Sequence, residues 1–186
     1  MVLLHTPPGE LGAQAAPFEL TGTDGKVHRL EDYKDAKALV VMFICNHCPY
    51  VLAVEERLIR LAESLQSHNI AVVGINSNDA TNYPDDSFEN MCQRSAEKNY
   101  TFDYLYDDSQ QVAKAYGAIC TPDFFIYDGA QKLRYRGRLD DAPRHPAQVS
   151  KEELKIAAIA IAEGKPLAQD QHASMGCSIK WKPENV

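Results

Sequence analysis

The sequence predicts one α/β domain with a mixed central sheet, helices on both faces and an N-terminal β-hairpin. Apolar runs as long as a buried strand occur at 38–44 and 70–76. Segments with an apolar residue at every third or fourth position, as in amphipathic helices, follow these runs. Two adjacent strand patterns and a last helix come later, an order that favours parallel strands flanked by antiparallel ones. The 186 residues are an ordinary length for a single domain.

The first elements are a hairpin, a strand and a helix. Residues 16–30 are expected to form the hairpin, with Asp24 and Gly25 in its turn. The continuous apolar run 38–44 is typical of a strand covered on both faces. From Pro49 the apolar period becomes helical. The helical stripe consists of Val51, Val54, Leu58, Leu61 and Leu65.

The middle of the chain adds two further strand–helix pairs. Residues 70–76 are a second buried strand, and a helix is expected at 85–98. Residues 101–106 form a short strand before a compact helix at 107–117, with Asp or Ser as its N-cap and Gly117 at its end. Because the carboxyl ends of parallel strands meet at one edge of a sheet, the loops there are the expected ligand site.

Residues 122–139 are expected to form two strands joined at Gly129. In the second strand Arg134, Arg136 and Arg138 alternate with apolar or small residues, so they share one face. This row is either an anion-binding face or the solvated face of an edge hairpin, and we favour the second interpretation.

The last predicted helix begins with a capping box from Ser150 to Glu153 and ends at Gly164. We therefore expect a single domain over residues 1–186, with a core at about 15–165 and a tail at 166–186.

Composition excludes several functions. The net charge is −7 and no stretch concentrates Lys and Arg, which argues against nucleic-acid and anionic-membrane partners. The apolar runs are too short to cross a bilayer, and the first residues lack the basic region of a secretory signal. Five cysteines, an odd number, argue against a disulfide-stapled secreted fold. We therefore expect a cytoplasmic protein.

Residues 45–48 read C-N-H-C, directly after the strand run 38–44. Two cysteines at this spacing serve either metal binding or dithiol exchange. A structural zinc site needs four ligands, and the chain has only this closely spaced pair. Dithiol exchange needs one pair, so we expect redox chemistry without a metal or another cofactor.

The junction between strand and helix favours the same chemistry. Unpaired N–H groups and the positive end of a helix dipole stabilise a thiolate. We expect Cys45 to face solvent as the ionised thiol, with Cys48 one turn further in, where it can displace a mixed disulfide. Pro49 suits the first helical turn. His47 either stabilises the thiolate of Cys45 or is an exposed residue at the start of the helix.

Longer stretches carry a family resemblance. F-I-C-N-H-C-P-Y and, downstream, C-T-P-D-F-F-I-Y-D resemble the thioredoxin superfamily. I-A-V-V-G-I-N and F-D-Y-L-Y-D-D-S-Q-Q-V-A-K-A-Y-G resemble its redoxin branch, which holds peroxiredoxins and thiol–disulfide oxidoreductases of the cytochrome-maturation type. The resemblance covers roughly residues 15–165 and implies a thioredoxin-like three-layer fold.

The resemblance also implies roles for individual residues. It makes Thr121–Pro122 a cis-proline loop that faces the cysteine pair and binds an extended substrate through its backbone. It makes Cys45 the nucleophile and Cys48 the resolving thiol. The expected catalytic residues are Cys45, Cys48 and His47, and the expected substrate-binding residues are Asn46, Thr121 and Pro122.

The sequence departs from the family pattern in two places. Thioredoxins have tryptophan before the first cysteine and a buried acid on the preceding strand, but here Ile44 precedes Cys45 and that strand has no acid. The proton of Cys48 would then pass to Asp79, Asp123 or a water. Peroxiredoxins have threonine three residues before their reactive cysteine, whereas Cys48 has a second cysteine there, which lowers the peroxidase interpretation.

Three further cysteines are harder to place. Cys120 precedes Thr121, so it is either a third redox thiol or a small buried side chain, and we favour burial. Cys177, in the tail, either reaches the same region or lies apart from it. Cys92 is expected in the core.

These observations predict a thiol–disulfide oxidoreductase that cycles Cys45 and Cys48 between dithiol and disulfide. Its partners would be a thiol or disulfide substrate, protein or small molecule, and an upstream reductant. A peroxiredoxin-like thiol peroxidase with antioxidant activity is one alternative. A non-catalytic binding module that keeps the fold is another.

Overall fold

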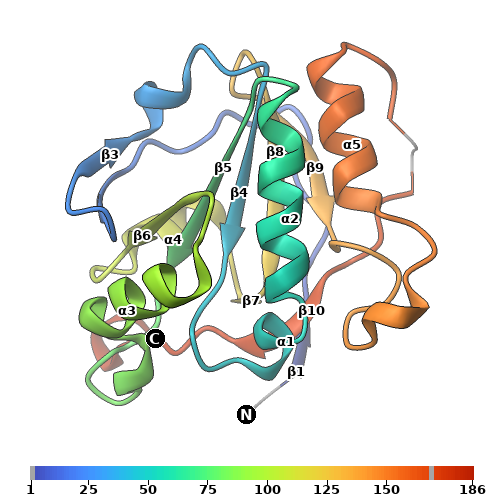
Figure 1. Cartoon of the computed structure of the whole chain (residues 1–186). Coiled ribbons are helices and arrows are strands. Elements are labelled where there is room, and N and C mark those ends of the chain that lie inside the picture. Colours follow the sequence, from blue (N-terminus) through green and yellow to red (C-terminus); the bar gives the residue numbers. More distant parts are fainter. Residues whose placement is uncertain (1–2, 168–169) are drawn as a thin grey trace.

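The computed structural model describes residues 3–167 and 170–186. Within them seven strands form a mixed sheet, in which the central strands are parallel and the outer ones antiparallel (Figure 1). Their order is β3 (Val27–Arg29), β2 (Glu19–Gly22), β6 (Asp103–Tyr106), β5 (Ile70–Asn76), β4 (Ala38–Phe43), β8 (Asp123–Asp128) and β9 (Leu133–Gly137). The predicted mixed sheet and the N-terminal hairpin, β2–β3, are confirmed.

β4 is a central strand, and all of its residues are buried. It pairs in parallel with β5 and antiparallel with β8. Val40 and Met42 point into one apolar cluster, whereas Val41 and Phe43 point into the cluster on the opposite face. The unbroken apolar run predicted this burial on both faces.

Helices cover both faces of the sheet, as predicted (Figure 1). The cluster around Val40 includes residues of α1 (Pro49–Leu52), α2 (Glu55–Gln66), α3 (Phe88–Lys98) and α5 (Glu153–Ala162). The opposite cluster includes residues of α4 (Gln111–Tyr116). Single 3-10 turns are η1 (Leu30–Tyr33), η2 (Pro84–Asp86), η3 (Pro146–Gln148) and η4 (Pro183–Asn185).

The helix predicted from Pro49 is split. α1 ends at Leu52, and α2 begins at Glu55 after a turn. All five residues of the predicted stripe are nevertheless buried. The break between α1 and α2 therefore leaves the predicted apolar stripe buried.

The predicted capping box of the last helix does not form. The N-cap of α5 is Glu152, and the hydroxyl and N–H of Ser150 bond to Asp141 instead. The carboxylate of Glu153 is engaged by Arg138. A long-range ion pair has thus replaced the local cap that the sequence pattern favoured.

α4 also starts differently from the prediction. Its N-cap is Gln110, which has a φ of 63°, rather than Asp or Ser. Asp107 still supports this helix, because its carboxylate accepts the N–H of Ala113 at 2.9 Å. Gly117 ends α4 in the left-handed region, as predicted.

The arginine row on β9 is only partly a solvated face. Arg134 is exposed and pairs with Asp128, but Arg136 is 7% exposed and pairs with Asp123 at 2.8 Å. The interpretation of the row as solvated is therefore wrong for Arg136. A buried carboxylate on the neighbouring strand accounts for its burial.

The tail contains a strand that the sequence did not predict. β10 (Met175–Ser178) lies between β1 (Leu3–His5) and β7 (Cys120–Thr121) in a small antiparallel sheet. In Figure 1 this red segment crosses the end of the main sheet close to α1. Nowhere in residues 3–167 and 170–186 is a helix long and apolar enough to cross a membrane.

Candidate active site

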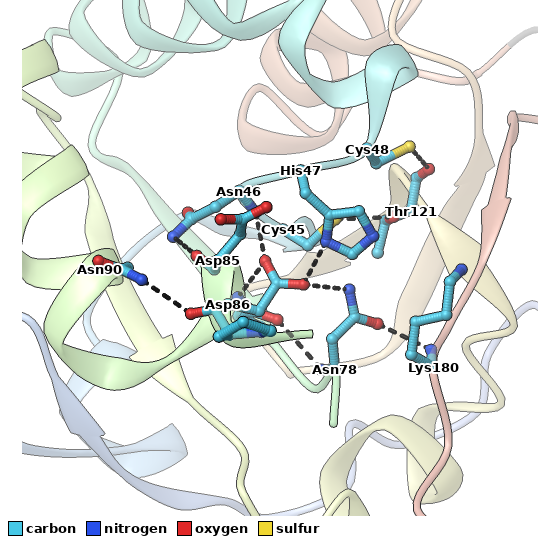
Figure 2. A network of polar contacts seen from close by, with 12 residues as sticks. Cys45, Asn46, His47, Cys48, Asn78, Asp85, Asp86, Asn90, Thr121 and Lys180 are labelled. Carbon is cyan, nitrogen blue, oxygen red and sulfur yellow. Dashed lines mark hydrogen bonds and ion pairs between the residues drawn. The ribbon is translucent and has the colours of Figure 1, made fainter. Parts of the chain in front are cut away.

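The loop after β4 brings both cysteines of C-N-H-C against the β7–β8 connection. Cys48 is the N-cap of α1, and the peptide bond between Thr121 and Pro122 is cis. The sulfur of Cys45 lies 3.2 Å from the hydroxyl oxygen of Thr121. The sulfur of Cys48 lies 3.1 Å from the carbonyl oxygen of Thr121, to which its thiol donates when Cys48 is protonated (Figure 2). The structure thus brings Cys45, Cys48 and Thr121 together.

Neither thiol faces solvent. Cys45 is 2% exposed and Cys48 is 0% exposed. The prediction that Cys45 lies open at the mouth of the helix is therefore wrong. The acidic turn η2 contacts this loop, and β10 contacts Cys48, so both segments help to enclose the site.

The pKa values of the two thiols are shifted in opposite directions. Hydrogen bonds from the thiol of Cys45, from the thiol and N–H of Cys177 and from the N–H of Val51 hold the pKa of Cys48 far below its usual range. Burial, followed by the bond to Cys48, raises the pKa of Cys45 well above its usual value. These directions favour Cys48 over the predicted Cys45 as the thiolate, because Cys48 accepts the N–H of Val51 in α1. The role of Cys45 as the nucleophile stays a prediction.

A buried carboxylate that the sequence analysis missed organises this loop. Asp86 is 0% exposed. Its carboxylate accepts hydrogen bonds from the backbone N–H of Asn46 at 2.7 Å and from Nδ1 of His47 at 2.6 Å (Figure 2). It also accepts the side-chain amides of Asn76 at 3.2 Å and Asn78 at 2.8 Å. Burial alone would raise the pKa of Asp86, but the bonds from His47 and Asn78 bring it below its usual value.

The two acids predicted to assist Cys48 are engaged elsewhere. Asp79 accepts from Thr81 and Asn82 within its own loop. Asp123 pairs with Arg136, and burial raises the pKa of Asp123 to about 6. The signal that would have identified Asp86 is its place in the polar loop after β5, at the sheet edge where strand ends gather.

His47 is neither exposed nor directed mainly at Cys45. Its side chain is 15% exposed, and its ring stacks on Tyr83 with centroids 5.4 Å apart. The hydrogen bond with Asp86 raises the pKa of His47. A charged His47 therefore compensates Asp86 first, while remaining close to Cys45.

Cys45, His47 and Asp86 place possible metal-ligand atoms within 4.8 Å of one another. A thiol ligand must lose its proton to bind a metal, and the raised pKa of Cys45 opposes that loss. Asp86 is also occupied by its four donors. The expectation of no metal at this site stays a prediction.

Asn46 holds the loop through both ends of its amide. Its nitrogen donates to the carbonyl oxygen of Asp85 at 2.8 Å, and its oxygen accepts the hydroxyl of Tyr104 at 3.0 Å. The residue is 7% exposed. These contacts give it a structural role, so the predicted contact with substrate finds no support in the geometry.

The edge expected to bind substrate is occupied by the chain itself. Cys177 of β10 lies opposite Thr121 in antiparallel register. Burial, followed by the bond to Cys48, raises the pKa of Cys177 to about 11. Of the two positions that the sequence left open for Cys177, the structure shows the one beside the cysteine pair.

The other two cysteines are Cys120 and Cys92. Cys120 is 0% exposed and its sulfur is 3.9 Å from the carbonyl oxygen of Pro122. Burial raises its pKa strongly, which fits the favoured interpretation of a small buried side chain. Cys92, expected in the core, is only half-buried on α3.

A model of the AhpC/TSA family matches residues 11–136. The chain belongs to this family. Members of the AhpC/TSA family are generally thiol-based redox enzymes. No curated protein matches the chain.

Two solved structures resemble this AhpC/TSA protein over nearly its whole length. An uncharacterized conserved protein from Geobacillus kaustophilus is 50% identical, covers 98% of both chains and has a TM-score of 0.94. A hypothetical protein from Sinorhizobium meliloti 1021 is 40% identical over 96% of this chain and 98% of its own, with a TM-score of 0.92.

A more distant structure shows the type of fold. The thioredoxin domain of a thiol-disulfide oxidoreductase from Bacteroides vulgatus is 16% identical, covers 69% of this chain and 89% of its own, and has a TM-score of 0.59. The predicted thioredoxin-like fold of the redoxin branch is therefore confirmed. In this AhpC/TSA protein, one acidic thiol is enclosed with two less acidic ones, an arrangement suited to sulfur exchange.

Proposed function

We propose that this protein is a thiol–disulfide oxidoreductase that exchanges electrons through Cys45 and Cys48. The observation that carries the proposal is the hydrogen bond from the thiol of Cys45 to the sulfur of Cys48, whose pKa is lowered. A thiolate and a thiol in contact are the reduced form of a dithiol couple. Family membership supports the same chemistry.

The reductive half of the cycle begins at Cys48. Its thiolate attacks one sulfur of a substrate disulfide, a bond forms between Cys48 and that sulfur, and the other substrate sulfur leaves as a thiolate. Cys45 then loses its proton and attacks Cys48, which releases the second substrate thiolate and forms the Cys45–Cys48 disulfide. Two electrons have passed to the substrate, and an upstream reductant returns the protein to the dithiol.

The proton of Cys45 has one nearby acceptor, His47 in its neutral form. His47 and Asp86 both present atoms within 4.8 Å of the sulfur of Cys45. We assign the proton transfer to neutral His47, with Asp86 holding its ring through Nδ1, in place of Asp79 and Asp123. The expected cytoplasmic location and the absence of a cofactor stay predictions.

A thiol peroxidase is the second candidate, and the enclosure of Cys48 favours it. A peroxide needs less room than a protein disulfide to reach a sulfur that is 0% exposed. The Cys48 thiolate would attack one peroxide oxygen, form a sulfenic acid and release water or an alcohol. Cys45 would then displace water from that sulfenic acid and form the same disulfide.

The test of the proposal is disulfide exchange with glutathione. We expect the wild-type protein to form the Cys45–Cys48 disulfide in oxidised glutathione, and Cys48→Ser to lose at least about 100-fold in exchange rate because the thiolate is gone. Cys92→Ser is the matched control and should exchange at the wild-type rate. A wild-type protein that keeps both thiols across the glutathione series would refute the proposal and favour a non-catalytic binding module.

Stopped-flow mixing with hydrogen peroxide separates the two candidates. A specialised peroxidase should react with peroxide far faster than a free thiol of equal pKa. A rate that only matches such a thiol would leave disulfide exchange as the function.

A further inference from the structure

We infer that Cys177 is a third redox thiol of this site, which forms a disulfide with Cys48 by exchange with a disulfide already made there. This inference deepens the proposed function and rests on it. It assigns a chemical role to β10, the strand that the tail contributes.

The first supporting observation is the close packing of β10 against the cis-proline loop. Cys177 lies opposite Thr121 in the strand register, and the N–H of Ile179 donates to the carbonyl oxygen of Ile119 at 3.0 Å. On the other side of Cys177, the hydroxyl of Ser174 donates to the carbonyl oxygen of Pro122 at 2.8 Å. Contacts before and after Cys177 therefore fix its position.

The second observation is the glycine before Cys177. A Cβ atom at Gly176 would lie 2.0 Å from the carbonyl oxygen of Thr121 and 2.9 Å from the nitrogen of Pro122. Both neighbours are backbone atoms and have little room to yield. Only glycine lets β10 approach this loop so closely, and the approach brings the next residue to Cys48.

The third observation is the contact between the two sulfurs. The sulfur of Cys48 accepts hydrogen bonds from both the thiol and the N–H of Cys177. The thiol of Cys177 thus faces the same sulfur as the thiol of Cys45. Cys48 has two thiol neighbours, and each is placed to bond to it.

The exchange step balances without an external oxidant. When Cys48 is bonded to Cys45 or to a substrate sulfur, the sulfur of Cys177 attacks the sulfur of Cys48. The Cys48–Cys177 bond forms, the older disulfide bond breaks, and the leaving sulfur takes up the proton that Cys177 loses. One disulfide is exchanged for another, and no electrons are gained or lost.

The state of Cys48 controls when Cys177 reacts. In the reduced protein Cys177 donates to a thiolate, and after burial this bond is the largest cause of its raised pKa. Once Cys48 is in a disulfide, it carries no charge, so its bond to Cys177 no longer raises the pKa of Cys177. Cys177 then loses its proton more easily, at the stage where its attack is productive.

Peptide mapping can distinguish the two disulfides. Cys45 and Cys48 share the tryptic peptide 38–57, so their disulfide stays within one peptide. Cys177 lies in the peptide 156–180, because trypsin does not cut between Lys165 and Pro166. A Cys48–Cys177 disulfide would therefore join two peptides that are otherwise separate.

The experiment is oxidation of Cys45→Ser by oxidised glutathione, followed by acid quenching, alkylation and mass spectrometry. We expect peptides 38–57 and 156–180 to be cross-linked, with two thiols lost per chain. Cys45→Ser/Cys92→Ser is the matched control and should give the same cross-link. Cys45→Ser/Cys177→Ser should instead keep glutathione on Cys48. If Cys45→Ser itself keeps glutathione on Cys48 while Cys177 still alkylates, the inference is overturned.

Wild-type protein supplies a readout that no substitution can disturb. We expect the cross-linked peptides as a second species during its oxidation, next to the internal disulfide of 38–57. An internal disulfide alone, at every time point, would refute the role of Cys177 and leave the proposed function standing. Cross-linked peptides without the internal disulfide would refute the Cys45–Cys48 couple but would still support a redox role for Cys177.

Discussion

Asp86 is the residue that ties the C-N-H-C loop to the sheet. Its carboxylate joins Asn46 and His47 of that loop to Asn76 and Asn78 at the end of β5. A buried carboxylate is tolerated only when hydrogen bonds and a compensating charge replace its lost hydration. His47 supplies the charge when it is protonated, so the stability of the site depends on pH.

His47→Gln should therefore destabilise the protein more in acid than in base. The pKa of His47 is raised in the folded state by the bond with Asp86. Its contribution is complete below the ordinary histidine pKa of about 6.5 and is lost as the pH rises through the folded value. We expect urea unfolding under reducing conditions to show a cost of about 1 kcal/mol at pH 5.5 and a smaller cost at pH 9.

The control is His145→Gln, a change at an exposed histidine. It should alter stability by less than about 0.5 kcal/mol at either pH. A His47→Gln cost that is equal or larger at pH 9 would contradict the ion pair with Asp86.

The sequence predicts the pair of cysteines but not which of them has the lower pKa. The spacing of Cys45 and Cys48 predicts a couple, and the structure brings the two sulfurs into contact. The pKa of Cys48 is lowered first by the bond from Cys45 and then by donors from Cys177 and Val51, which only the fold brings together. Cys177 adds two donors from a position 129 residues further along the chain, which no local pattern reveals.

At the scale of elements, β10 depends on Gly176, and Gly176→Ala should displace it. The added Cβ would lie 2.0 Å from the carbonyl oxygen of Thr121, so the strand must move. We expect a loss of about 1–3 kcal/mol in stability, as for other overpacked sites. We also expect Cys48 to be alkylated by iodoacetamide about tenfold faster, because its cover opens more often.

Gly129→Ala is the matched control for this substitution. Its Cβ would be 3.5 Å from the nearest atom, the carbonyl oxygen of Lys37, which is an ordinary contact. The control should leave the alkylation of Cys48 unchanged. Unchanged alkylation in Gly176→Ala as well would show that β10 does not limit access to Cys48.

Sequence patterns located the elements of the main sheet but missed β10 and the break between α1 and α2. β4 and β5 were predictable because burial on both faces demands an unbroken apolar run. The strand β10 reads M-G-C-S and has no such pattern. It is a strand only because its partners, β1 and β7, lie at distant points of the chain.

At the scale of the whole molecule, the sheet and its two helical layers follow from the order of strands and helices in the sequence. Layers form because each strand and each amphipathic helix must bury an apolar face. The closure of the active site does not follow from this rule. It needs the turn η2, whose Asp86 bonds to the C-N-H-C loop (Figure 2), and the strand β10, whose Cys177 bonds to Cys48.

The redox state of the cysteine pair should change the stability of the entire fold. The donors that lower the pKa of Cys48 come from α1, β10 and Cys45, and they are assembled only in the folded protein. The reduced folded protein therefore binds fewer protons than the reduced unfolded chain over a range of pH. Its stability rises with pH in that range, by at most about 1.4 kcal/mol per pH unit for one proton. The oxidised protein has no thiol at Cys48 and lacks this dependence.

We therefore expect urea unfolding between pH 5 and pH 8.5 to show that the free energy of unfolding of the reduced form increases with pH relative to that of the oxidised form. The contribution of Cys48 is complete above the ordinary thiol pKa and is lost as the pH falls through the lowered folded value. The same free energy must appear in the redox potential, because about 1.4 kcal/mol corresponds to 30 mV for a two-electron couple. Glutathione equilibrium at each pH supplies that second measurement, with Cys92→Ser as the control. A difference between the two forms that does not vary with pH would show that the folded protein does not hold Cys48 as a thiolate.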